Sequence, residues 1–103
     1  MSLNKDVYSL LGLASRARKV VSGDLLIASI RKKESSFVII ATDASENSFK
    51  KISDKCKFYG IQYVVAGTID EISKAIGKNN RVAIGISDHG FSKKIKEKII
   101  GGN

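Results

Sequence analysis

The chain has 103 residues, of which 43% are hydrophobic, and this length suits one domain with an apolar core of its own. No apolar run approaches the roughly 20 residues that cross a membrane as a helix, and the first residues lack the apolar core of a secretion signal. Lys and Arg outnumber Asp and Glu by 18 to 10, so the chain carries a net charge of +8, which indicates a polyanionic partner such as a nucleic acid.

The first predicted helix begins near Asn4, because asparagine is a favourable residue at a helix N-terminus. Its apolar residues recur at the spacing of one helical face, namely Val7, Leu10, Leu11 and Ala14. A short strand over residues 19–21 and a second helix from about residue 24 are predicted next.

The segment between these two helices concentrates positive charge. Residues 1–33 hold a net charge of +5 out of the total of +8. The segment contains three cations and then three turn or cap residues: Arg16, Arg18, Lys19, Ser22, Gly23 and Asp24. Basic side chains before a helix N-terminus are typical of a phosphate-binding corner, but an ordinary strand-to-helix turn with solvated cations is the commoner arrangement. By itself, the segment favours the ordinary turn.

Three further apolar runs are predicted as strands, at residues 37–41, 61–66 and 82–86. A helix follows each of them. Thr68 and Glu71 have the spacing of a capping box, which places the start of one of these helices.

Helices and strands therefore alternate along the chain, which is typical of the α/β class. We predict a three-layer α/β/α sandwich, with about five helices on the two faces of a four-stranded mixed sheet whose strands are mostly parallel. Gly85 interrupts the last strand, which indicates close packing or a β-bulge there. Residues 1–103 are expected to form a single domain.

The sequence lacks the motifs of the common enzyme classes. It has no phosphate loop, no dinucleotide-binding glycine pattern and no nucleophile elbow. The single cysteine, Cys56, and the single histidine, His89, can form neither an internal disulfide nor a Cys/His metal site. Helix capping accounts for Asp24, Asp43 and Asp88, each near a predicted helix start, and Ser45 is a competing cap beside Asp43. We therefore expect a binding protein in a reducing cytoplasm, with no catalysis, no metal and no cofactor.

Five segments of the chain resemble the kink-turn-binding ribosomal-protein superfamily. They read GLASRARKVVSG at 12–23, ATDASEN at 41–47, DKCKFY at 54–59, AIGK at 75–78 and SDHGFSKK at 87–94. That group includes the archaeal large-subunit protein 7A, the eukaryotic large-subunit protein 30 and bacterial members, to which the likeness is greatest. The resemblance covers nearly the whole chain, and it implies a three-layer α/β/α fold and RNA binding without catalysis.

In that superfamily, the start of the second helix meets sheared G·A pairs of a kinked RNA. The loop after the fourth helix covers an extruded nucleotide, and an acid after the second long strand lies nearby. With the basic segment, the resemblance implies these RNA-binding residues: Arg16, Arg18, Lys19, Ser22, Gly23, Asp24, Asp43, Gly77, Lys78, Asn79, Asn80 and Arg81. The sequence departs from archaeal relatives at the helix start, where Asp24 and Leu25 replace an Asn-Glu pair.

Our first hypothesis is a monomeric protein that recognises a kinked or otherwise structured RNA, with ribosomal RNA among the candidates and no membrane attachment. The alternative is an adaptor that docks on the ribosome or on translation factors without contacting RNA. A small RNA-directed enzyme ranks third, because the chain has no room for a second catalytic domain. The loop at 78–81 follows a helix, so its distance from Gly23 cannot be derived from sequence spacing.

Overall fold

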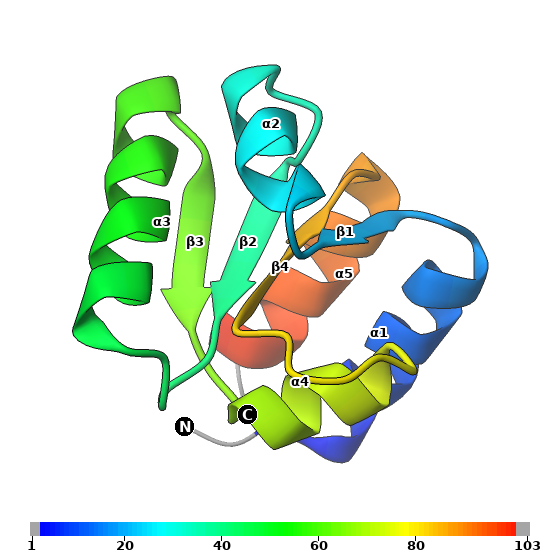
Figure 1. Ribbon diagram of the computed structural model, residues 1–103. Helices are drawn as coiled ribbons and strands as arrows, with labels where there is room; N and C mark the ends of the chain where they lie inside the picture. The colour runs from blue at the N-terminus through cyan, green and yellow to red at the C-terminus, as the bar shows by residue number, and fades with distance from the viewer. Residues whose placement is uncertain (1–2, 101–103) are drawn as a thin grey trace.

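The computed structural model describes residues 3–100, and within them it has five helices and four strands (Figure 1). In chain order they are α1 (Lys5–Arg16), β1 (Val20–Ser22), α2 (Leu25–Arg31), β2 (Phe37–Ile40), α3 (Glu46–Tyr59), β3 (Gln62–Val65), α4 (Ile69–Ala75), β4 (Ala83–Ile86) and α5 (His89–Ile100). The predicted elements are confirmed in kind and order. None of the described helices is long and apolar enough to cross a membrane.

The four strands form one mixed sheet in the order β1-β4-β2-β3. β2 and β3 are parallel, whereas β4 runs antiparallel to both β1 and β2. The prediction of a mixed sheet is confirmed, but the prediction that its strands are mostly parallel was wrong. A parallel connection needs a crossover that returns along the sheet. The seven-residue α4 instead lies beside the strand ends, so the chain enters β4 from the end at which β3 finishes (Figure 1).

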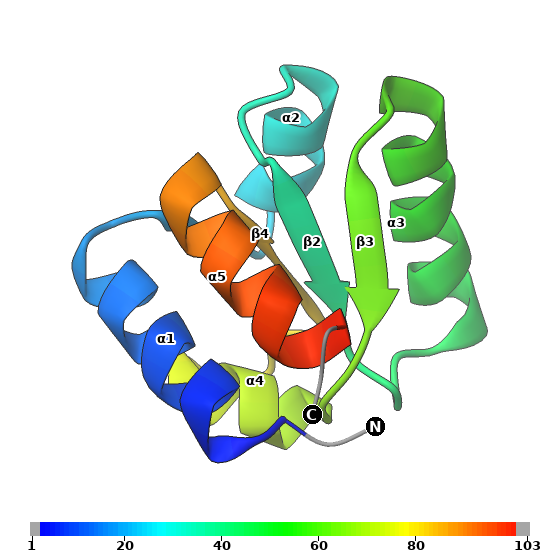
Figure 2. The same cartoon turned by 180° about the vertical axis from the view of Figure 1, so that it is seen from behind.

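Helices cover both faces of the sheet, as the predicted three-layer architecture requires (Figures 1 and 2). One apolar core lies between the sheet and α1, α4 and α5, and a second lies between the sheet and α2 and α3. Successive side chains of a strand point to opposite faces. Accordingly Phe37 and Ile39 enter the first core, and Val38 and Ile40 enter the second. β2 is buried along its whole length, as its continuous apolar run predicted.

The starts of α1 and α4 follow the local capping signals. The side chain of Asn4 accepts a hydrogen bond from the backbone N–H of Val7 at 2.9 Å. At α4, the hydroxyl of Thr68 accepts from the N–H of Glu71 at 3.1 Å, and the Glu71 carboxylate accepts from the N–H of Thr68 at 3.0 Å. These contacts confirm the predicted helix start and capping box.

Gly85 and Cys56 are both buried, and each serves the packing of the core. Gly85 lies in the middle of β4, where the side chains of Ser35 and Leu26 occupy the space that a Cβ would need. Because β4 keeps an unbroken register with β1 and β2, Gly85 serves close packing and does not form a bulge. Cys56 is fully buried in the second core, and burial raises the pKa of its thiol from 9.0 to about 11. It is therefore a small core residue and not a reactive thiolate.

Candidate nucleic-acid interface

The last residue of β1 and the loop after α4 meet in space, although their contacting side chains are 59 positions apart in the sequence. The Nε of Arg81 donates a hydrogen bond to the hydroxyl of Ser22 at 3.0 Å. An Nη1–H of the same guanidinium donates to the backbone carbonyl of Asn79 at 3.0 Å. Gly23 lies against this guanidinium with a left-handed φ of 66°, a conformation that glycine adopts without strain. Arg81 thus fixes the two segments relative to each other.

Two serines that the sequence did not single out hold this arrangement. Ser73, on α4, is 4% exposed; its hydroxyl accepts from the backbone N–H of Arg81 at 2.8 Å and donates to the carbonyl of Ile69 at 2.6 Å. The hydroxyl of Ser15 donates to the carbonyl of Ile76 at 3.1 Å, which joins the end of α1 to the end of α4. A buried hydroxyl needs hydrogen-bond partners. A serine on an otherwise apolar helix face was therefore the sequence signal that could have identified these contacts.

The three cations before β1 lie exposed on a tight reversal of the chain. Backbone hydrogen bonds from Arg18 to Ser15 and from Lys19 to Ala14 end α1 at 3.0 and 2.8 Å. This is the geometry of a Schellman motif, whose left-handed position is usually glycine. Here Arg18 occupies it with a φ of 60°. Across residues 3–100, no carboxylate forms an ion pair with Arg16, Arg18 or Lys19, so their charges face solvent.

A hollow of about 340 Å³ lies beside the loop after α4. The loop contributes Lys78, Asn79 and Asn80 to its wall, and Asp43 closes it from the end of β2. Of the two cap candidates at α3, Ser45 caps the helix, so the cap role of Asp43 was wrong. The Asp43 carboxylate instead accepts from the N–H of the first residue of α4 at 2.8 Å, which brings it beside the loop. The structure therefore joins Asp43 to the other candidate residues.

The start of α2 differs from its prediction. Asp24 has helical backbone angles, and its exposed carboxylate forms no capping hydrogen bond. The helix begins at Leu25, whose side chain is 70% exposed, and it has only seven residues. Such a short helix aligns few peptide dipoles, so its N-terminus attracts anions less than the sequence suggested. The side-chain cations carry the electrostatics of this corner.

The candidate residues therefore lie in two neighbouring groups, one at each end of β1. Ser22 and Arg81 bond directly, Gly23 packs on their contact, and Lys78 and Asn80 surround the adjoining hollow. Gly77 ends α4 with a φ of 68° and directs the chain into this loop. The basic residues sit at the far end of β1, about 10 Å away by the rise of a three-residue strand. Cations and hydrogen-bond donors lie here beside the carboxylates of Asp24, Asp43 and Asp70, and the exposed cations at residues 16–19 suit binding of a polyanion.

Comparison with known proteins identifies close relatives of this chain. The model of the ribosomal protein L7Ae/L30e/S12e/Gadd45 family matches residues 5–96. The RNA-binding protein YlxQ of Bacillus subtilis (strain 168) is 44% identical over 89 residues, which are 85% of this chain and 89% of that protein. The RNA-binding protein YlxQ of Enterococcus faecium is 45% identical over 94 residues, 90% of each chain.

Solved structures give the same fold. A protein of unknown function from Bacillus halodurans C superimposes with a TM-score of 0.88 and 38% identity, covering 93% of this chain and 98% of that one. The Giardia lamblia 15.5kD RNA binding protein superimposes with a TM-score of 0.73 over 96% of this chain and 88% of that one. At 18% identity, the second likeness concerns the fold alone.

Proposed function

The chain belongs to the ribosomal protein L7Ae/L30e/S12e/Gadd45 family, and on this basis we propose that it binds a structured, kinked RNA. The RNA would lie on the surface formed by residues 16–24, Asp43 and residues 77–81, which we call the RNA surface. The relatives named RNA-binding protein and the net charge of +8 support RNA as the ligand. The observation that carries the location is the hydrogen bond between Arg81 and Ser22, because it joins two separately marked segments into one surface.

The RNA surface divides into two parts with different roles in this proposal. The exposed cations Arg16, Arg18 and Lys19 contact phosphates, which supplies affinity and orients the RNA. At the other end of β1, the corner around Gly23 and the loop after α4 contact bases or sugars that a kink exposes. Amide side chains suit this second role, because they both donate and accept hydrogen bonds.

The residues at the start of α2 favour recognition of the RNA by its shape and not by hydrogen bonds to the base edges of G·A pairs. Asp24 and the exposed Leu25 stand where archaeal relatives have an Asn-Glu pair. Leu25 forms no hydrogen bonds through its side chain, so it can contact a base face or a sugar but cannot read a base edge. G·A pairs would then matter because they hold the RNA in its kinked shape.

The proposal is tested by titrating the purified protein with a kink-turn RNA and with a control RNA whose G·A pairs are replaced by Watson–Crick pairs. We expect the kink-turn RNA to bind at least about tenfold more tightly at physiological salt, since the control cannot present the kinked shape. Equal, tight binding to both would reduce the function to electrostatic binding of RNA. Failure to bind either RNA would refute the proposal and favour the adaptor that docks on the translation machinery through protein contacts alone.

Lys19 should contribute one phosphate contact. Replacing Lys19 by alanine should flatten the slope of log affinity against log salt by about one unit, because one fewer counterion is released on binding. The matched control is Lys57→Ala on the exposed side of α3, which should leave the slope unchanged. A slope that is the same in Lys19→Ala and in the native protein would remove Lys19 from the interface.

Arg18 should lower the stability of the fold while it strengthens RNA binding. Arg18→Gly should raise the free energy of unfolding by about 0.5–1 kcal/mol, because glycine adopts the left-handed φ of this position without strain. The same variant should bind RNA more weakly, because it lacks a cation of the RNA surface.

Lys33 offers a matched control for this prediction. It has a φ of 57° in the same motif at the end of α2, outside the RNA surface. Lys33→Gly should gain similar stability in urea unfolding and keep the native RNA affinity. If the two variants bind RNA equally well, Arg18 does not contact it.

A further inference from the structure

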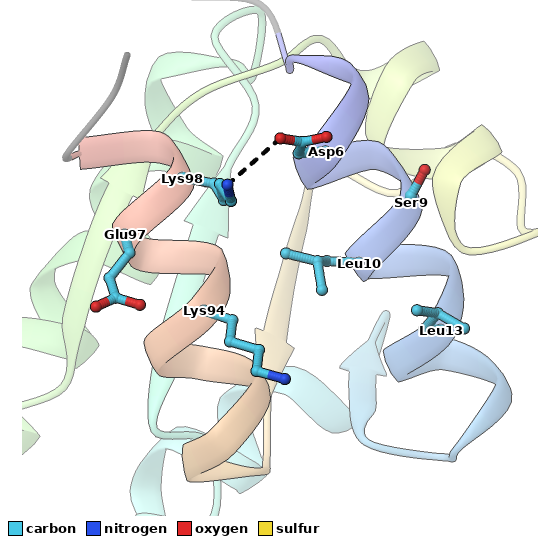
Figure 3. Close-up of a pocket in the computed structure, with 7 residues that line it drawn as sticks. All are labelled: Asp6, Ser9, Leu10, Leu13, Lys94, Glu97 and Lys98. Carbon is cyan, nitrogen blue, oxygen red and sulfur yellow. Dashed lines mark ion pairs between the residues drawn. The ribbon is translucent and has the colours of Figure 1, made fainter.

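A groove of about 500 Å³ lies between α1 and α5, and none of the contacts proposed above uses it (Figure 3). The two helices are antiparallel, because the first turn of α1 meets the last turn of α5. There the ammonium of Lys98 pairs with the carboxylate of Asp6 at 3.5 Å, and the Asn4 amide donates to the Lys98 carbonyl at 3.2 Å. These contacts close one end of the groove, and the other end stays open.

The open part of the groove is apolar on one side and positively charged on the other. Leu10 points from α1 towards α5, and Leu13, further along α1, is 48% exposed (Figure 3). Lys94 extends from α5 towards α1, while Glu97 points away (Figure 3). Within residues 3–100, no carboxylate forms an ion pair with Lys94. The groove thus offers two leucines and one unneutralised ammonium group.

Most of the RNA surface lies on the opposite face of the molecule; only its cations at residues 16–19 lie near the open end of the groove, because α1 ends at Arg16. β1 and the loop after α4 lie towards the viewer in Figure 1, whereas α1 and α5 lie towards the viewer in Figure 2. A second macromolecule could therefore occupy the groove while RNA occupies the other face. RNA itself suits the groove poorly, because two leucines line it and Asp6 already neutralises Lys98, which leaves a single free ammonium for phosphates.

From this chemistry we propose that the α1/α5 groove binds an amphipathic helix of a partner protein, which places a carboxylate opposite Lys94. Two antiparallel helices of 12 residues, each about 18 Å long, form the kind of groove into which a third helix packs. The partner would place apolar residues at i, i+3 or i+4, and i+7 over Leu10 and Leu13. The acid would neutralise the one ammonium that the groove leaves free, which selects acidic helices over basic ones.

The experiment uses two libraries of 16-residue helical peptides, displayed against the full-length protein. Both vary Leu, Ile, Met and Phe along one apolar stripe; one library has Glu and the other has Lys at the position that flanks the stripe. We expect the native protein to select peptides from the Glu library. The Lys94→Glu variant should instead select peptides from the Lys library. Lys93→Glu, one residue away and outside the groove, is the charge-matched control and should select from the Glu library like the native protein.

Leu13→Glu tests the apolar contact. Leu13 is half exposed, so the variant keeps the fold, and it should weaken the selected peptides at least about tenfold. The same peptides should bind equally well when the protein is saturated with kink-turn RNA. Selected peptides that tolerate both Leu13→Glu and Lys94→Glu would overturn the proposal.

Two further measurements test whether the groove is occupied by a second copy of the chain or by RNA, and either result would overturn the proposal. Sedimentation that shows a dimer of the native protein, lost in Leu13→Glu, would assign the groove to a second copy of the chain. RNA affinity that falls in Lys94→Glu but not in Lys93→Glu would assign the groove to RNA. The selection is independent of RNA binding, so its failure and the failure of the RNA proposal are distinguishable.

Discussion

Replacing Arg81 by alanine should weaken binding to kink-turn RNA by about tenfold to a hundredfold, or ~1.4–2.7 kcal/mol. The variant removes a cation from the RNA surface and also the hydrogen bonds that hold the Ser22 turn and the Asn79 carbonyl together. The pairing of β1 with β4 and the bond between the Arg81 backbone and Ser73 would remain, but the loop would lose its side-chain tie to Ser22 and to the Asn79 carbonyl, and the RNA would have to order it on binding. Fluorescence anisotropy with labelled RNA at physiological salt measures the loss.

Three measurements separate this effect from a general loss of charge or fold. Arg31→Ala removes an exposed arginine at the end of α2, outside the RNA surface, and should change the affinity less than about twofold. Arg81→Lys keeps the charge but loses the planar guanidinium that bonds Ser22 and Asn79 through two separate nitrogens, so its affinity should be intermediate. Both Arg81 variants should unfold near the native urea midpoint. Native RNA affinity in folded Arg81→Ala would show that this contact has no part in binding.

Gly85→Ala should produce the largest loss of stability among single-methyl additions to the sheet, about 1–3 kcal/mol. The new methyl group would meet the hydroxyl of Ser35 and a methyl group of Leu26. The Ser35 side chain is fully buried and hydrogen-bonded to Ser29 at 2.8 Å, and β4 is held by strands on both sides. Neither the strand nor the side chain can move without breaking other contacts. Urea unfolding measures the change.

A second substitution identifies the cause of this loss. Ser35→Ala removes the hydroxyl that the new methyl group meets, so the double variant should recover part of the stability lost in Gly85→Ala. Ser29 keeps a partner, because its hydroxyl also donates to the Leu26 carbonyl at 2.7 Å. Gly12→Ala on α1 is the control with the opposite sign, since it should stabilise the helix by up to about 1 kcal/mol. Strict additivity of the Gly85 and Ser35 effects would exclude their steric contact as the cause.

The sequence predicted the local elements because their causes lie within a few residues. The Asn4 cap and the Thr68–Glu71 capping box depend on side chains three positions from the groups that they bond. The burial of β2 followed from five consecutive apolar residues at 37–41, a run of strand length that is typical of a strand covered on both faces. The resemblance named the candidate RNA-binding residues, and their contact with RNA stays a prediction.

The tertiary structure alone decided the direction of β4 and the assembly of the RNA surface. The direction of β4 depends on where α4 docks, which no residue of β4 encodes. The contact between Ser22 and Arg81 joins positions 59 residues apart, and it exists because β1 pairs with β4 and Ser73 holds the loop. Helical and strand periodicity reports only which side of an element is buried. Which elements become neighbours is settled by how all the buried faces pack together, and so is the position of the site between them.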